Sequence, residues 1–386
     1  MSEFRITLSE LNYGCEEDSA VKRVLRNKWL TMGPEVKAFE NEFSALHGIK
    51  YCFAVANGTA ALQMALLASG IGPGDEVIQP ALNFVAAANI TRAVGAHPVF
   101  VDILSLAEPT INPAEIERCI TDQTKAVVVM HYGGYPCRMS EIVELCRLKG
   151  LVLIEDACHA VGARFEDAGG RRPHGHLCGS LGDVAAFSFF SNKNLATGEG
   201  GMVITNREDI AERLRLLRSH GMTSLTWQRH DKSIGVYDVV QGGYNFRMDD
   251  LRAALGREQL KKLAIGNRKR KELVQYYWRR LADCPALTLP FRFYRGASAY
   301  HLMAVLAPDE RTRDAMRRRM HEAGIQTSFH YPCITMFSAF AAYRNFLVPA
   351  SLDFAKRVLT LPLHPLLTQT TVEDICSELL NTQSKQ

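Results

Sequence analysis

Several features that point directly to a function are missing from this sequence of 386 residues. No apolar run approaches the roughly 20 residues that a membrane-spanning helix needs, so we expect no membrane insertion. The formal net charge of +4 is too small to predict a nucleic-acid partner. The basic stretches at residues 268–271 and 317–319 lie in heavily charged helical segments, which is typical of a solvated helix face. Internal repeats and low-complexity tracts are also absent.

Paired cysteines are missing too. The ten cysteines are scattered without CxxC pairs or zinc-like spacing, which argues against a metal site. The N-terminus has no apolar core of the kind found in secretory signals. We therefore expect reduced thiols and a cytoplasmic protein.

What the sequence does contain, up to about Met248, is an alternation of short apolar runs with segments of helical periodicity. This alternation predicts an α/β fold in which a mostly parallel sheet is sandwiched by helices. The predicted strands cover residues 51–56, 77–79, 98–101, 126–130, 151–154, 184–188 and 202–205. The predicted helices cover residues 59–69, 84–93 and 138–149, and helical spacing also relates Val36, Phe39, Phe43 and Leu46.

Beyond Met248 the pattern changes. A long charged helix is predicted over residues 249–281, with Gly256 and Gly266 as weak points. We interpret the rest of the chain as a smaller α+β domain, and we place the large domain, with its N-terminal segment, at 1–255 and the small domain at 256–386. The long helix can belong to both. The small domain is predicted to contain strands at 301–306 and 325–330 and helices at 310–322 and 351–357.

The chemistry begins with Lys193, which lies in a predicted turn after an apolar run. The run Ser188–Lys193 is followed by the glycine-rich segment Gly198–Gly201. A lysine whose pKa is lowered by burial or a nearby cation exposes a neutral amine that condenses with an aldehyde. This arrangement is what a Schiff base with pyridoxal 5′-phosphate (PLP) requires.

Two residues near the end of another predicted strand meet further requirements of PLP. Asp156 directly follows the run at 151–154, at the sheet edge where open α/β folds bind ligands, and can pair with the pyridine nitrogen. His159 can lie over the ring or bond its phenolic oxygen, and Phe84 can stack on the other face. Taken singly, each residue has an ordinary structural explanation, such as a cap or a core aromatic.

A phosphate site is predicted where a strand meets a helix, at Asn57, Gly58 and Thr59. Free N–H groups and the helix dipole favour an anion there, and a glycine lets the backbone come close. The hydroxyl of Ser188 can add a donor. The order of these separate requirements along the chain, more than any one of them, predicts a PLP enzyme.

With these residues in hand, the chain resembles the DegT/StrS family of sugar aminotransferases, which are PLP enzymes of fold type I. The resemblance runs nearly the whole length of the chain and is specific only when its motifs are taken together. The matching stretches are Trp29–Gly33, Asn57–Leu62, Gly72–Val77, Glu155–Ala160, Ser188–Lys193, Gly198–Gly201, Gly243–Arg247, His330–Pro332 and Leu361–Pro365.

The resemblance implies a role for each matching residue. Lys193 would form the Schiff base, Asp156 would pair with the ring nitrogen, and His159 would lie at the ring or its phenolic oxygen. Phosphate contacts would come from Gly58, Thr59 and Ser188. Asn245 would match a phosphate contact that family members contribute from the neighbouring subunit, which implies a homodimer with shared active sites.

The implied activity is amino transfer through PLP, with pyridoxamine phosphate (PMP) as the intermediate form. The amino donor we expect is L-glutamate, and the acceptor is a nucleotide-linked keto-sugar, most simply an NDP-4-keto-6-deoxyhexose, made for surface polysaccharide or glycosylated natural products. Candidate substrate contacts are His131, Tyr132, Arg247, His330 and Tyr331, and the polar, aromatic segment at 220–237 is a further candidate.

Other functions stay open at this point. The same cofactor residues serve a 3-keto-sugar or cyclitol aminotransferase. Some relatives are PMP-dependent sugar dehydratases with histidine in place of the lysine, so Lys193 favours transamination. A PLP-binding regulator without turnover is the remaining alternative, against which the intact Lys193, Asp156 and His159 argue.

Overall fold

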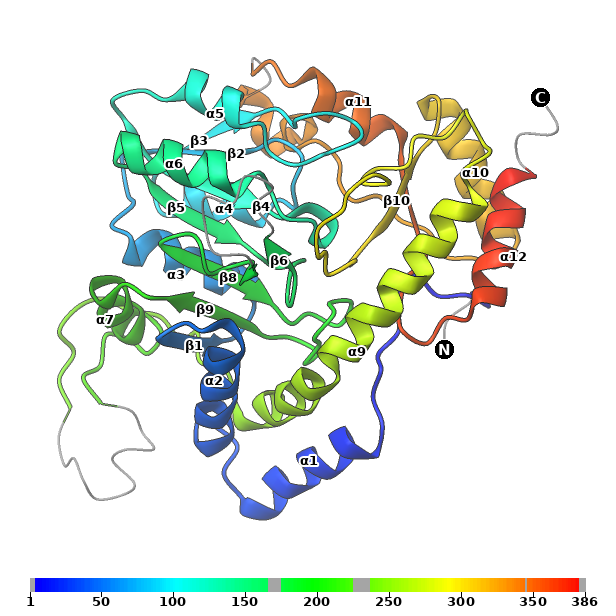
Figure 1. Cartoon of the computed structure of the whole chain (residues 1–386). Helices are drawn as coiled ribbons and strands as arrows, with labels where there is room; N and C mark the ends of the chain where they lie inside the picture. Colours follow the sequence, from blue (N-terminus) through cyan, green and yellow to red (C-terminus); the bar gives the residue numbers. More distant parts are fainter. Residues whose placement is uncertain (1–3, 166–174, 225–236, 344–345, 382–386) are drawn as a thin grey trace.

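The structure is a computed structural model that describes residues 4–165, 175–224, 237–343 and 346–381 (Figure 1). Its centre is a seven-stranded sheet with the strand order β1-β9-β8-β5-β4-β2-β3. Within this sheet, β9 runs in the opposite direction to the other six strands, so the predicted, mostly parallel sheet is confirmed. The strands are β1 (Tyr51–Val55), β2 (Glu76–Pro80), β3 (His97–Val101), β4 (Thr124–Met130), β5 (Val152–Asp156), β8 (Val184–Ser188) and β9 (Gly201–Thr205).

Helices cover both faces of this sheet (Figure 1). On β1, Phe53 and Val55 face one helical layer while Cys52 and Ala54 face the other, because successive side chains of a strand alternate between faces. One layer contains α3 (Gly58–Ala68), α4 (Ala86–Ala93) and α7 (Glu208–Leu217). The other contains α2 (Pro34–His47), α5 (Pro113–Cys119), α6 (Met139–Lys149) and the start of α9 (Asp250–Arg280).

The long helix α9 connects the two parts of the molecule. It begins where the side chain of Asp249 accepts a hydrogen bond from the N–H of Arg252, and it continues unbroken for 31 residues. Its first half packs against α1 (Cys15–Asn27) and α2, and its second half enters the core of the smaller lobe through Leu273, Val274 and Tyr277. Because α9 belongs to both cores, the domain boundary at 255/256 stays a prediction.

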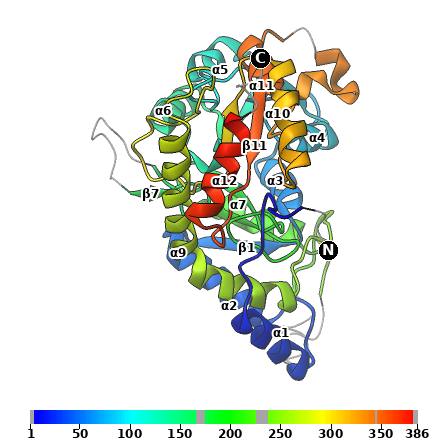
Figure 2. The same ribbon diagram turned by 90° about the vertical axis from the view of Figure 1, so that its right-hand side faces the viewer.

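The smaller lobe pairs β10 (Met303–Leu306) with β11 (Val358–Leu361) in antiparallel register. Figure 2 shows α10 (Glu310–Glu322) and α12 (Gln369–Leu380) together on its outer side, and α11 (Pro349–Arg357) precedes β11. The remaining elements are β6 (Arg164–Phe165), β7 (His176–Leu177) and the 3₁₀ helices η1 (Tyr132–Gly134), η2 (Ile334–Met336) and η3 (Ser338–Tyr343). None of the described helices is long and apolar enough to cross a membrane.

The strand predicted over residues 325–330 was wrong. Ile325 makes one isolated bridge to Ile6, and Ser328 makes one to Thr360. The segment therefore passes from one neighbour to another without forming a ladder with either. The missed partner of β10 is β11, which follows α11 directly in the sequence.

Candidate active site

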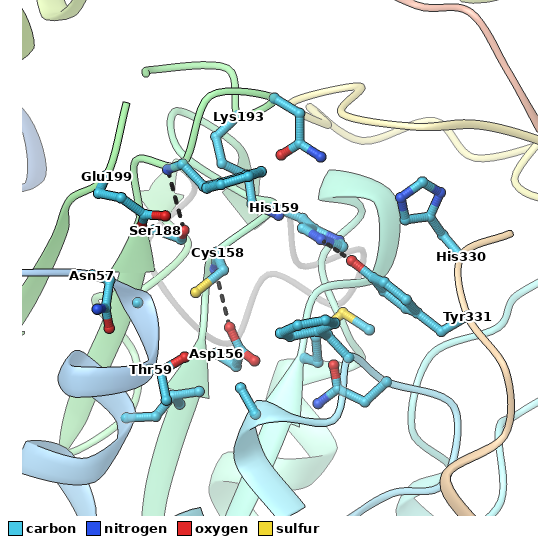
Figure 3. A pocket seen from close by; sticks show the side chains of 18 residues that line it. Asn57, Thr59, Asp156, Cys158, His159, Ser188, Lys193, Glu199, His330 and Tyr331 are labelled. Atoms are coloured by element: carbon cyan, nitrogen blue, oxygen red, sulfur yellow. Dashed lines mark hydrogen bonds between the residues drawn. The ribbon is translucent and has the colours of Figure 1, made fainter. Parts of the chain in front are cut away.

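A cavity of about 420 Å³ lies where β4, β5 and β8 end. These strands pair in parallel, so their carboxyl ends meet at one edge of the sheet, as ligand sites in open α/β sheets do. The start of α3 and two residues of the smaller lobe, His330 and Tyr331, complete the walls. Figure 3 shows Lys193, Asp156, His159 and Ser188 together in this cavity.

Lys193 lies in the turn that follows β8. Its N–H donates to the carbonyl of Phe190 at 2.8 Å, and the loop closes where Thr197 donates to the carbonyl of Phe189 at 2.8 Å. Burial lowers the pKa of the Lys193 amine, and the nearby Cys158 and Asp156 oppose this shift. The structure therefore moves this lysine toward the neutral amine that Schiff-base formation needs.

Asp156 is the last residue of β5 and is only 5% exposed. Its Oδ1 accepts the N–H of Cys158 at 3.2 Å (Figure 3). Burial raises the pKa of this carboxyl, while its bonds with Cys158 and the charge of Lys193 oppose the shift. A second N–H donor carrying positive charge, placed against the carboxylate, would stabilise its ionised form.

His159 follows in the turn after β5 and contacts the smaller lobe. Its Nε2 lies 2.8 Å from the hydroxyl of Tyr331 (Figure 3). The N–H of Gly133 points at its Nδ1 at 3.4 Å. Burial, followed by the charges of Lys193 and His330, lowers the pKa of His159 well below its ordinary value. His159 is therefore a neutral ring whose hydrogen lies on Nε2, facing Tyr331.

The start of α3 is the place where the sequence predicts an anion site. Asn57 caps the helix by accepting the N–H of Ala60 at 2.8 Å, and the first N–H groups of a helix have no intrahelical acceptor. A side chain at Gly58 would place its Cβ 2.8 Å from the Cβ of Ser188, so only glycine fits between α3 and β8. Ser188 and Thr59 also line the cavity.

These residues fit PLP. The cavity offers a lysine with a lowered pKa, a buried carboxylate at the end of β5, and a helix N-terminus for the phosphate. Phe84 lines the cavity and is 54% exposed, with its ring 5.9 Å from that of Tyr331. Phe84 and His159 both line this cavity, whose volume of about 420 Å³ is large enough for a ligand of this kind.

Two predicted substrate contacts were wrong, because both side chains are buried away from the cavity. His131 is fully buried, with its Nε2 3.0 Å from the Glu155 carboxylate. Glu155 also accepts three backbone N–H groups, so this pair anchors the chain after β7. Tyr132 is 1% exposed, and its hydroxyl donates to the carbonyl of His330.

The other substrate candidates differ in position. His330 and Tyr331 line the cavity, and their contact with substrate stays a prediction. Arg247 instead donates to the hydroxyl of Ser219 at 2.9 Å and lies outside the residues that line the cavity. Asn245 is exposed and bridges Ser219 through its backbone, and its contact with a neighbouring subunit also stays a prediction. Most of the segment 220–237 lies outside the described residues.

The residues that line the cavity but were not predicted from the sequence include Cys158, Asn192 and Glu199. Each lies inside a motif that is recognised through another residue. The motifs could therefore have predicted these residues, because residues close to a site lysine or aspartate in a tight turn can line the same cavity.

The chain matches one family profile over residues 12–380, that of the DegT/DnrJ/EryC1/StrS aminotransferase family. The chain belongs to this family. It is accordingly an aminotransferase, and its resemblance to fold type I PLP enzymes is confirmed.

Two curated proteins illustrate the family relationship. The chain is 39% identical to the spore coat polysaccharide biosynthesis protein SpsC of Bacillus subtilis, over 94% of this chain and 93% of that protein. It is 36% identical to the dTDP-4-dehydro-2,3,6-trideoxy-D-glucose 4-aminotransferase of Saccharopolyspora spinosa, over 97% and 95% of the two chains.

Solved structures in the family share the fold. PseC of Helicobacter pylori, an aminotransferase involved in the biosynthesis of pseudoaminic acid, matches with a TM-score of 0.90 at 27% identity, over 99% of this chain and 100% of that one. The aminotransferase TlmJ of Streptoalloteichus hindustanus matches with a TM-score of 0.89 at 34% identity, over 98% and 99%.

Proposed function

We propose that this protein is a PLP-dependent aminotransferase that moves an amino group from L-glutamate to the keto group of a nucleotide-linked sugar. The observation that carries the proposal is the meeting of Lys193, Asp156 and His159 in one cavity beside a helix N-terminus. Members of this family that aminate sugars include the Saccharopolyspora relative, whose acceptor is a dTDP-linked 4-keto-sugar. We infer a 4-keto-6-deoxyhexose as the acceptor class for this chain.

Each residue has a definite task in this proposal. PLP, when bound, supplies the electron sink that accepts the electron pair left at the Cα of the amino donor. The carboxylate of Asp156 would hold a proton at the pyridine nitrogen, and the first N–H groups of α3 with Ser188 would hold the phosphate. The neutral ring of His159 would lie against the cofactor ring without adding charge.

Lys193 has two tasks. Its amine would hold the cofactor covalently, and the same amine, once free, would take the proton from Cα of the amino donor and act as its acid in turn. Burial assists both, because a lowered pKa increases the fraction of the amine that is neutral. A dehydratase of the histidine type would lack this group.

The complete site is expected to need a second copy of the chain. Asn245 is exposed near the end of β1, in a strip that also exposes Tyr237, Val239, Val240 and Tyr244. An exposed apolar strip of this kind is typical of an interface. We propose a homodimer in which Asn245 reaches the phosphate of the neighbouring site.

One experiment tests the proposed function directly. The purified protein is incubated with PLP, L-glutamate and a panel of nucleotide-linked 3-keto-sugars, 4-keto-sugars and cyclitol ketones, and NMR locates the aminated carbon. We expect nitrogen at C4 of a 6-deoxyhexose. Amination at C3 or of a cyclitol would correct the acceptor, and no amination of any member would contradict the function.

Borohydride reduction followed by peptide mapping tests the attachment. The reduced cofactor should be found on Lys193. A label on another residue would contradict the assignment of this lysine.

A further inference from the structure

The residue next to Lys193 is the centre of a polar network that the proposed chemistry does not use. The Nδ2 of Asn194 donates to the carbonyl of Ala299 at 2.7 Å and to Oδ1 of Asn267 at 2.8 Å. Its Oδ1 lies 3.0 Å from Nδ1 of His301. This single amide therefore connects the lysine loop to α9 and to the segment that leads into β10.

The direction of every hydrogen bond in this network is fixed by two backbone carbonyls. Asn267 donates through Nδ2 to the carbonyl of Val161 at 2.9 Å, so its Oδ1 faces Asn194 as an acceptor. Asn194 must then turn its NH₂ group toward that oxygen and toward Ala299, which leaves its own oxygen facing His301. Because this oxygen can only accept, the contact is a hydrogen bond only when Nδ1 of His301 carries the hydrogen.

This tautomer leaves a lone pair on the other nitrogen of the ring. Nε2 of His301 is buried and has no hydrogen-bond partner among the described residues. Burial lowers the pKa of His301 well below its ordinary value, and the charges of the surrounding His159, Lys193, Arg270 and His330 lower it further. A proton on Nε2 would create a second buried cation near the guanidinium of Arg270.

The ring of His301 packs against the ring of His159, with 4.4 Å between the centroids and a tilt of 41°. The two histidines are also connected through the backbone of Gly133. Its carbonyl accepts the backbone N–H of His301 at 2.8 Å, and its own N–H points at Nδ1 of His159. The network thus contacts Lys193 through the adjacent residue and His159 through ring packing.

We propose that Asn194 and His301 form one positioning unit for Lys193 and His159, in which Asn194 holds His301 as the neutral Nδ1–H tautomer. The unit fixes the lysine loop against α9 and supports the His159 ring with a ring of no charge. Lys193 then remains the group that moves the proton. The catalytic consequence rests on the proposed function, whereas the tautomer and the position of the loop do not.

The tautomer is measured in the cofactor-free protein by ¹⁵N NMR of labelled histidines, with the signal of His301 identified by its loss in His301→Phe. We expect the neutral Nδ1–H form across the neutral pH range, and a mixture of tautomers in Asn194→Ala. An Nε2–H form or an imidazolium at neutral pH in the unchanged protein would overturn the proposal.

The positioning role is tested by a set of variants. Asn194→Ala and His301→Phe should each lower kcat about ten- to a hundred-fold with little change in KM, because small displacements of a reacting group have effects of this size. His301→Asn retains an N–H near the position of Nδ1 and should recover part of the loss. The double variant Asn194→Ala/His301→Phe should be no slower than the slower single variant, since each single variant already removes the same contact between Asn194 and His301.

His47→Phe is the matched control. His47 is also buried and stacked on an aromatic ring, that of Phe43, but it is the last residue of α2 and lies outside the residues that line the cavity. It should leave kcat unchanged. Additive losses in the double variant, or an unchanged kcat in both single variants, would contradict the positioning unit.

A readout that needs no activity separates the positioning unit from the proposed function. In the cofactor-free protein, the pH at which Lys193 is methylated by formaldehyde and cyanoborohydride should shift in Asn194→Ala and not in His47→Phe. If the unchanged protein aminates no substrate, the proposed function fails, and this shift and the NMR result still decide whether the positioning unit exists. An unchanged methylation pH in Asn194→Ala would count against the positioning unit.

Discussion

At the scale of single residues, burial sets the chemistry of the site. It lowers the pKa values of Lys193 and His159 and raises that of Asp156. All three shifts favour the uncharged form, as expected when ionisable groups leave water. A protonated pyridine ring beside Asp156 would restore the charge of the carboxylate, so the site and its cofactor complete each other electrostatically.

Lys193→Ala should abolish both the visible absorbance of bound cofactor and all turnover. The free energy of unfolding should change little, because the side chain is only half-buried and lines a cavity rather than the core. Absorbance spectra, steady-state kinetics and urea denaturation check the three expectations. Lys261→Ala, which removes an exposed lysine paired with Glu258, should behave like the unchanged protein. Turnover by the Lys193 variant would show that another base moves the proton.

Asp156→Asn should retain cofactor but lose at least about a hundredfold in kcat, since an uncharged amide no longer stabilises the protonated ring. Kinetics with saturating PLP measure the loss. Asp209→Asn, at an exposed ion pair with Arg207, serves as the control. An Asp156 variant as fast as the unchanged protein would mean that this carboxylate does not face the ring nitrogen.

At the scale of elements, helix α9 is held by a close fit at one glycine. The sequence pattern predicts a weak point at Gly256, but a Cβ there would lie 2.7 Å from the ring of Phe39 in α2. At Gly266, in the second half of the helix, the nearest atom to an added Cβ is 3.6 Å away, on Pro365. An added side chain would therefore clash at Gly256 but fit at Gly266.

Gly256→Ala should destabilise the protein by about 1–3 kcal/mol, because the methyl group overpacks a buried contact. Gly266→Ala should stabilise it by about 0.5–1 kcal/mol, because alanine favours the helix and meets no clash. Urea denaturation of both variants measures the two free energies of unfolding. Equal signs would show that the contact with Phe39 does not set the spacing of α2 and α9.

At the scale of the whole molecule, the fold buries several histidines in neutral form. Burial lowers the pKa values of His47, His330 and His364 to about 4, and those of His159 and His301 in the same direction. His131, which contacts the carboxylate of Glu155, is not one of this group. Between about pH 4 and 6.5, His47, His330 and His364 are therefore protonated in the unfolded chain and neutral in the folded chain.

Stability should accordingly fall as the pH drops below about 6.5, by up to about 1.4 kcal/mol per pH unit for each such histidine. The sign follows because the folded pKa values are depressed, so acid favours the unfolded state. Urea midpoints between neutral and mildly acidic pH measure the slope, and His47→Phe should make it shallower. A midpoint that rises with acid in this range would contradict the buried neutral histidines.

How much of this could be predicted depends on whether a residue's role is local. The strand ends at Asp156 and Ser188, the junction of strand and helix at residues 57–59 and the turn at Lys193 follow from neighbouring residues, and the structure places all of them in the cavity. Leu46, in contrast, is 39% exposed although its spacing predicted an apolar face, and the neighbouring histidine takes the buried position instead. The burial of that histidine depends on a ring of β8, which no local pattern reveals.

The alternation of strands and helices, the sheet edge and the family can all be read from the amino-acid sequence, because each is encoded in periodicity or in short motifs. Three features could be found only from the packed chain: His131 and Tyr132 are buried in the interior, His330 and Tyr331 reach the cavity from the smaller lobe, and Asn194 contacts His301. These are contacts between segments far apart in the chain. Their geometry is set by how the two lobes pack, and side-chain direction after a strand can follow either face until that packing is known.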